Sequence, residues 1–140
     1  MSGRFFIDTN LLVYAIDPSD QGKREIAIKW LTAAHRTGEG ILSYQVVQEW
    51  FNVVLRKAAV RLKPDEAISL YRTLIEPLWH VHSSRELLDT ALELHRHDFV
   101  SWWDALVVSA AIHGGCDRLL SEDLQHGRRI AGVRVHNPFL

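Results

Sequence analysis

Four carboxylates in this sequence lie in apolar surroundings, where acids are uncommon. They are Asp8 between FFI and LLV, Glu49 in VVQEWFNVV, Asp104 in SWWDALVVSAA and Asp123 just after RLLS. An isolated buried carboxylate is costly unless it is paired, protonated or bound to a metal. If the four converge, they form an acidic pocket with oxygen ligands only, which suits Mg²⁺ or Mn²⁺. Such a site can hydrolyse a phosphodiester through metal-activated water, without a nucleophilic side chain.

Each of the four acids also has an ordinary structural interpretation. Asp104 completes Ser101-x-x-Asp104, a helix-capping pattern found throughout helical proteins. Asp123 could be a turn residue, and Glu49 could flank its apolar helix face and reach solvent. Asp8 is the hardest to explain in this way, because an acid directly after a buried strand has few structural reasons to be there.

The elements that must position these acids alternate along the chain. Apolar and β-branched runs predict strands at residues 4–7, 41–43, 79–82, 118–121 and 133–135. Helical spacing and capping patterns predict helices at residues 23–34, 45–57, 64–75, 83–96 and 101–112. This alternation predicts a three-layer α/β/α sandwich with a central, mainly parallel sheet. Asp8 and Asp123 then lie at carboxyl ends of strands, where open α/β sheets bind ligands.

Composition favours one compact domain over residues 1–140, with 47% apolar residues and a net charge of −1. No apolar stretch approaches the ~20 residues of a membrane span, and the N-terminus lacks the pattern of a signal peptide. The single cysteine, Cys116, allows no intrachain disulfide and fits a reducing cytoplasm. The near-neutral charge argues against a DNA-coating protein but is compatible with a nuclease.

The acids and their neighbours together resemble the PIN-domain family of ribonucleases over essentially the whole chain. The matching motifs are the D-T-N of residues 8–10, the Glu of VVQEW, the W-D-A of residues 103–105, the L-L-S-E-D-L of residues 119–124, and the closing VRVHNPF. The resemblance implies a parallel α/β/α sandwich and a Mg²⁺- or Mn²⁺-dependent endoribonuclease that hydrolyses RNA. It also implies that Asp8, Glu49, Asp104 and Asp123 are its catalytic metal ligands.

Family members of this size are often VapC-type toxins of toxin–antitoxin pairs, so the resemblance implies a homodimer and a small antitoxin that blocks the site. Thr9, Asn10 and Ser121 are candidates for orienting the ligands or water by hydrogen bonds. Capping and turn formation explain the same three residues, and both roles can hold together. Glu122 is an added acid beside Asp123, which leaves open which of the two faces the metal.

Other sites and functions are weaker alternatives. The pairs His80-x-His82, His95-x-His97 and His113-x-x-Cys116 have no matching second pair at zinc-finger spacing. A PIN-like module that binds RNA or protein without cleaving is a second class of function. A metal-dependent phosphoesterase acting on another substrate is a third.

Residues outside the acidic set could contact nucleic acid. The basic candidates for phosphate contacts are Arg56, Lys57, Arg61 and Lys63 after the Glu49 helix, and Arg128, Arg129 and Arg134 after Asp123. Trp102 and Trp103 could stack on bases or belong to the core. Glu76 also has apolar neighbours, but it precedes Pro77 at a helix end, and we interpret it as structural.

Overall fold

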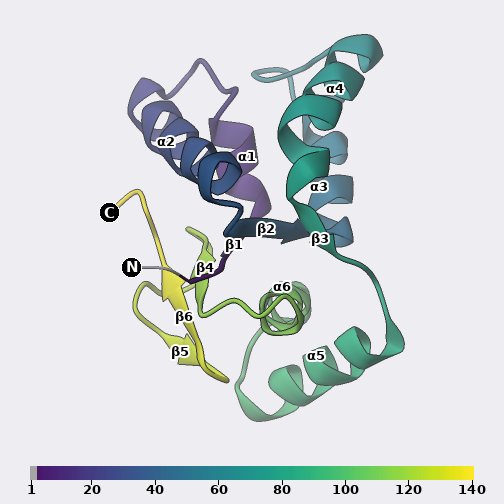
Figure 1. The fold of residues 1–140 in the computed structure, drawn as a ribbon, viewed down its shortest axis with the longest axis vertical. Helices are drawn as coiled ribbons and strands as arrows, with labels where there is room; N and C mark the ends of the chain where they lie inside the picture. Colours follow the sequence, from purple (N-terminus) through teal and green to yellow (C-terminus); the bar gives the residue numbers. More distant parts are fainter. Residues whose placement is uncertain (1–2) are drawn as a thin grey trace.

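A six-stranded sheet in the order β3-β2-β1-β4-β6-β5 lies at the centre of the structure, a computed structural model that describes residues 3–140 (Figure 1). The strands are β1 Phe5–Ile7, β2 Gly40–Ser43, β3 Trp79–Val81, β4 Arg118–Leu120, β5 Arg129–Ile130 and β6 Val133–His136. Every neighbouring pair is parallel except β5 and β6, which are antiparallel. The predicted α/β architecture with a mainly parallel sheet is confirmed.

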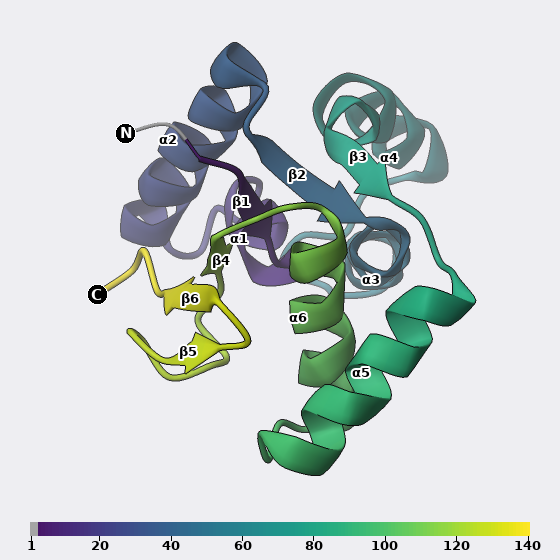
Figure 2. The same cartoon turned by 60° about the horizontal axis from the view of Figure 1, so that its bottom comes forward.

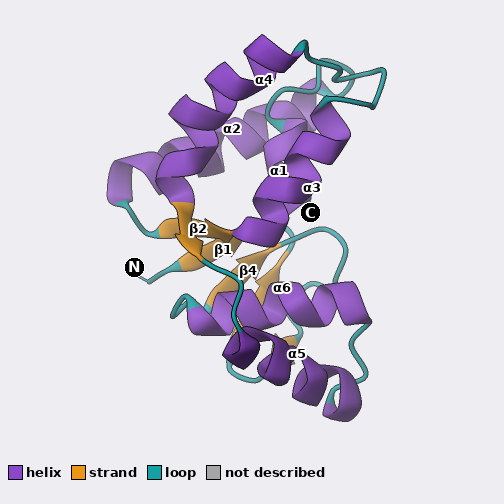
Figure 3. Ribbon diagram, turned by 90° about the vertical axis from the view of Figure 1, so that its right-hand side faces the viewer, coloured by secondary structure: helices purple, strands orange, loops and turns teal. Residues whose placement is uncertain are grey.

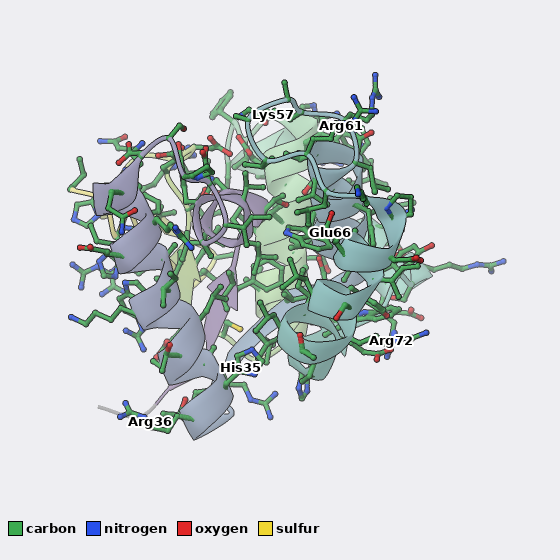
Figure 4. The ribbon with its side chains drawn as sticks, turned by 90° about the horizontal axis from the view of Figure 1, so that it is seen from above. His35, Arg36, Lys57, Arg61, Glu66 and Arg72 are labelled. Carbon is green, nitrogen blue, oxygen red and sulfur yellow. The ribbon has the colours of Figure 1, made fainter. Side chains whose placement is uncertain are left out.

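Helices cover both faces of this sheet. The α-helices are α1 Thr9–Tyr14, α2 Gln21–Thr37, α3 Tyr44–Val54, α4 Pro64–Leu70, α5 Arg85–His97 and α6 Trp102–His113. Figure 3 shows α1–α4 on one side of the strands and α5 and α6 on the other. Seen from above, α2 and α4 lie on opposite sides of the molecule, and His35 lies between α2 and the helical segment after α4 (Figure 4). His35 Nε2 is 2.9 Å from the carbonyl oxygen of Leu74 in that segment.

The sequence explains the close packing around the central strands. Helix α6 lies between the sheet and α5, and its small residues Ala105, Ala110 and Ala111 are buried (Figure 2). Gly40 begins β2 where a side chain has no room, because an added Cβ would meet Ala34 Cβ at 2.3 Å. The parallel pairing of β1 with β4 brings their carboxyl ends together, with Asp8 directly after β1.

Three local features differ from the predictions. The helix from Pro64 is α-helical only to Leu70 and continues as a π-helical turn, Tyr71–Ile75, and a 3₁₀ turn, Glu76–Leu78. The sequence places the start of α5 at the capping pattern Ser83-x-x-Glu86, but the cap is Ser84, whose hydroxyl oxygen accepts the backbone N–H of Leu87. The two-residue strand β5 was not predicted, since it is too short for alternation to show.

Candidate active site

Asp8 follows the central strand β1 and is almost fully buried, with 7% of its surface exposed. One carboxylate oxygen accepts the backbone N–H of Thr9 at 2.8 Å, so Asp8 caps helix α1. The other accepts the hydroxyl of Ser121 at 2.7 Å. The pairing of β1 with β4 places Ser121 there, because β4 ends one residue before it. The capping and orienting roles of this region therefore coexist.

Glu49 reaches the same region from helix α3. Its Oε1 accepts the hydroxyl of Thr9 at 2.7 Å, and its side chain is partly buried. Thr9 therefore connects the two acids, because its backbone N–H donates to Asp8 and its hydroxyl donates to Glu49. Glu49 is therefore partly exposed at the border of the apolar helix face, while its carboxylate accepts the hydrogen bond from Thr9.

Asp123 is held by two contacts in the loop after β4. Its backbone N–H donates to Ser121 Oγ at 3.1 Å, and its Oδ2 accepts Asn10 Nδ2 at 3.3 Å. Ser121 thus contacts Asp8 and Asp123 at once, and Asn10 connects helix α1 to this loop. The hydrogen bonds of the D-T-N segment and Ser121 therefore gather three of the four predicted acids.

Asp104 lies in the first turn of helix α6, where its Oδ2 accepts the hydroxyl of Ser101 at 2.8 Å. The predicted capping by Ser101 is confirmed, because Ser101 Oγ also accepts the Asp104 backbone N–H. Asp104 stands near enough to Asp123 for its negative charge to raise the pKa of that carboxyl. No hydrogen bond in residues 3–140 joins Asp104 to the other three acids. Its interaction with Asp123 is the repulsion between their negative charges.

Glu122 takes a different direction from Asp123. Its carboxylate binds Lys23 Nζ at 2.9 Å and accepts the hydroxyl of Tyr14. This cluster fixes the loop on the side of α1 and α2 and occupies the Glu122 carboxylate there. Lys23 and Tyr14 were missed by the sequence analysis, because nothing local in the sequence relates a helix lysine to a loop acid 99 residues later.

Burial and the neighbouring acids disfavour the ionised form of Asp8. Burial raises the pKa of Asp8 to about 7, although the hydrogen bonds from Ser121 and Thr9 act in the opposite direction. The negative charges of Asp123 and Glu49 raise it further. Burial also raises the pKa of Asp123. Among residues 3–140 Asp8 forms no salt bridge, and the Lys23 ammonium is paired with Glu122.

The donor set fits a hard divalent cation, but not as a closed cage. The side chains offer only oxygen, and Asn10 Oδ1 is buried without a hydrogen-bond partner in the described chain. Across residues 3–140, no three His, Cys, Asp or Glu side chains stand close enough to hold an ion by themselves. Mg²⁺ commonly keeps several waters and takes only one or two protein carboxylates. The arrangement is therefore compatible with a hydrated ion, and the metal-ligand roles stay predictions.

A hollow of about 360 Å³ adjoins Glu49. It is lined by Gln45, Gln48, Glu49, Asn52 and Trp103. The Trp103 side chain is 65% exposed, so it is not part of the core, whereas Trp102 packs against the core. Gln45 Nε2 is buried without a partner in residues 3–140. This hollow offers an aromatic face and the exposed amide of Gln48 beside Glu49.

Glu76 lies apart from the acids, as interpreted from its sequence position. Its carboxylate binds Arg72 at 3.1 Å and accepts the hydroxyl of Tyr71. An acid with apolar sequence neighbours is thus accounted for by local partners, in contrast to Asp8.

A sequence model of the PIN-domain family matches residues 5–132 of the chain. The chain belongs to the PIN-domain family. The match begins at β1 and includes all four acids and the last turn before β6. No curated protein sequence matches this PIN domain.

Solved structures similar to this PIN domain share its fold at low sequence identity. VapC20 of Mycobacterium tuberculosis, described as a sarcin–ricin loop cleaving toxin, is 19% identical with a TM-score of 0.61, over 93% of this chain and 98% of that one. FitAcB from Neisseria gonorrhoeae is 16% identical with a TM-score of 0.68, over 96% and 98%. DNA-bound VapBC from Salmonella typhimurium is 19% identical with a TM-score of 0.66, over 98% and 99%. Identities this low establish the fold alone.

No helix within residues 3–140 of this PIN domain is both long and apolar enough to cross a membrane.

Proposed function

We propose that this PIN domain is a Mg²⁺- or Mn²⁺-dependent endoribonuclease and the toxin of a toxin–antitoxin pair. The observation that carries the proposal is the state of Asp8: a buried carboxylate with a raised pKa, held at the end of the central strand beside two further acids. Such a charge is unfavourable in the free protein and is compensated when a cation binds. The raised pKa of a group at a strand end is also typical of functional sites.

The residues around the acids have distinct roles in this proposal. Asp8, Glu49, Asp104 and Asp123 would hold the metal, directly or through water. A bound divalent ion supplies polarisation of a phosphoryl oxygen and a water that is easily deprotonated. Thr9 orients Glu49, and Ser121 orients Asp8 and the backbone of Asp123. Glu122 acts only on the loop, through Lys23.

The hollow beside Glu49 supports single-stranded RNA as the substrate. An exposed indole such as Trp103 stacks on any base, and stacking is worth about 1–3 kcal/mol per base. The exposed side chain of Gln48, which lines the same hollow, offers an amide to a base edge. Unpaired RNA offers both its base faces and its base edges to such a surface.

An antitoxin partner is proposed because several structural neighbours are toxin–antitoxin complexes, among them VapBC from Salmonella typhimurium. A homodimer is the second part of this proposal. Leu88, Leu92 and Phe99 are exposed on and just after α5, and they are an apolar surface available for such a contact. Light scattering of the purified chain and of the chain co-expressed with its neighbouring reading frame measures both assemblies.

The deciding experiment incubates the purified chain with single-stranded and structured RNA in Mg²⁺, in Mn²⁺ or in chelator. We expect metal-dependent cleavage by the wild type and loss of cleavage in Asp8→Asn and Asp104→Asn. Glu76→Gln is the matched control, because Glu76 is an acid with apolar sequence neighbours that lies with Arg72, and it should cleave normally.

Two results would redirect the proposal. Equal cleavage by the wild type and both Asn variants would place the activity elsewhere or in a contaminant. RNA binding by a folded wild type that never cleaves in either metal would favour the non-catalytic binding module.

A further inference from the structure

Three arginines form one row across the last three strands of the sheet. Arg118 of β4 is in register with Arg134 of β6, which is in register with Arg129 of β5. In-register residues on neighbouring strands project from the same face, with strands about 4.8 Å apart. Like charges placed directly opposite each other destabilise a sheet. The three arginines therefore repel one another, and a bound anion would reduce this repulsion.

The burial pattern of β6 shows that this face is open. Val133 and Val135 are buried toward the core, whereas Arg134 between them is exposed. Figure 2 shows β5 and β6 at the end of the sheet beside α6, away from α3 and α4. The three arginines border a hollow of about 530 Å³, together with His126, His136 and one acid, Asp117.

Positive charge exceeds negative charge in this hollow. Asp117 lies 3.7 Å from Arg118 Nε, and residues 3–140 contain no ion-pair partner for Arg129 or Arg134. The whole chain carries a net charge of only −1, so this local excess is not a general property of the protein. Burial lowers the pKa of His136, and the neighbouring His126, Arg118 and Arg134 lower it further, as expected in a positive field.

Aromatic packing holds part of the row in place before any ligand binds. The Arg118 guanidinium lies 5.5 Å from the Phe5 ring centre and 6.0 Å from that of Trp30. The His136 ring packs against the same Trp30 at 5.4 Å.

His126 adds a hydrogen-bond donor of defined direction to the hollow. Its Nδ1 accepts the backbone N–H of Asn137 at 3.0 Å. A neutral imidazole with an accepting Nδ1 carries its proton on Nε2. Nε2 therefore remains a donor when the ring is neutral.

The structure also separates the basic residues that the sequence had grouped. Arg128 donates to the carbonyl oxygen of Asp98 and so is engaged within the fold. Arg118, which the sequence analysis did not consider, takes its place beside Arg129 and Arg134. Sheet register, and not nearness in sequence, selects the members of the row.

We propose that this arginine row is a second binding surface that holds the phosphate backbone of an RNA strand whose scissile bond lies at the acids. The proposal rests on the proposed function. An open row along three strands suits an extended polyanion, since a single phosphate favours converging donors. The loop after β4 carries Asp123 at its start and His126 further on, so it connects the acids to the hollow. Backbone hydrogen bonds of Gly127 and Arg128 with Val135 fix that loop against β6.

The test measures RNA binding without cleavage, using the full chain in chelator and a fluorescent single-stranded RNA across a salt series. Each lost phosphate contact lowers the slope of log affinity against log salt by about 0.7 for single strands. The double variant Arg129→Ala/Arg134→Ala should therefore lower that slope by about 1.4. The control is Arg85→Ala/Arg96→Ala, which removes the same charge from exposed positions on α5 and should leave the slope unchanged.

Three results of this experiment would overturn the arginine-row proposal. An unchanged slope in the Arg129/Arg134 variant, or an equal fall in the α5 control, overturns it. Competition by tripolyphosphate as strong as that of RNA at equal phosphate concentration would make the hollow a small-anion site, which also overturns it.

Failure of the nuclease proposal has a different signature. A wild type that binds RNA through the row but never cleaves with Mg²⁺ or Mn²⁺ would refute the nuclease and leave the row as an RNA-binding surface without a scissile bond at the acids. A wild type that cleaves while the Arg129/Arg134 variant keeps the wild-type slope would refute only the row.

Discussion

Replacing Asp8 by Asn should stabilise the metal-free protein at neutral and alkaline pH. The folded-state pKa of Asp8 is about 7, above its ordinary value of 3.8, so the folded protein binds a proton that the unfolded chain has released. Stability is therefore lost as the pH rises between about 4 and about 7. Above pH 7 the buried, ionised carboxylate lowers the free energy of unfolding, and the neutral amide of the Asn variant does not.

The size of the stability gain in Asp8→Asn follows from the difference between the folded-state and ordinary pKa of Asp8. A difference of about three pKa units corresponds to about 4 kcal/mol at 1.36 kcal/mol per unit. The amide retains an oxygen for the Thr9 N–H but presents an N–H₂ group to the Ser121 hydroxyl, which costs about 1 kcal/mol. The net gain at pH 8 is then about 3 kcal/mol, or roughly 6–12 °C in Tm for a chain of this length.

The assay is chemical and thermal denaturation in chelator from pH 5 to pH 8. Wild-type stability should fall over this range, and Asp8→Asn should lack that fall. Asp17→Asn is the matched control, because Asp17 is also buried but its pKa is lowered by hydrogen bonds from Ser19. Its carboxylate stabilises the fold above the unfolded pKa, so the Asn variant should lose stability at neutral pH.

Divalent ions supply a second measurement on the same pair of proteins. At a Mg²⁺ or Mn²⁺ concentration 100 times Kd, the wild type should gain about 2.7 kcal/mol and Asp8→Asn much less. The reasoning is refuted if metal-free Asp8→Asn is clearly less stable than the wild type at pH 8. Asp8 would then be a structural acid whose ionised form the fold requires.

Three further predictions concern positioning, substrate contact and packing. Ser121→Ala removes the hydroxyl that orients Asp8 and should lower RNA cleavage about 10–100-fold while the protein stays folded by circular dichroism; an unchanged rate would contradict the orienting role. Trp103→Ala should raise KM for single-stranded RNA about 5–100-fold with little loss of stability, since the indole is mostly exposed; a large fall in Tm would mean that the ring packs instead. Gly40→Ala should destabilise the protein by about 1–3 kcal/mol in urea, because the new Cβ meets Ala34; a neutral result would show that β2 shifts freely.

The sequence predicted the strands and acids where local pattern decides the outcome. Residues 4–7 and 118–121 are short apolar runs, and a parallel sheet buries such runs at its centre. The acids that follow them had to lie at the carboxyl edge once the strands were parallel. For this reason Asp8 and Asp123 could be placed near each other although 115 positions separate them in sequence.

Other features depend on contacts that no local pattern reveals. Glu122 turns to Lys23, and Arg128 turns to a carbonyl oxygen of residue 98, across long sequence separations. The arginine row depends on the register of β4, β6 and the unpredicted β5. The cap of α5 is Ser84 and not Ser83, although only Ser83 is followed by a glutamate three residues later, because the Ser84 hydroxyl accepts the Leu87 backbone N–H.

The position of β1 in the sheet has a consequence for synthesis of the protein. Its neighbour β4 begins at Arg118, and the Ser121 hydroxyl that holds Asp8 comes later still. On the ribosome, Asp8 and Glu49 are therefore synthesised long before the acids can be assembled. The β1–β4 pairing and the Asp8–Ser121 hydrogen bond form only when both partners have been made. If the assembled acids cleave RNA, the protein gains this activity only after β4 and Ser121 have been made, long after Asp8 and Glu49 have left the peptidyl-transferase centre.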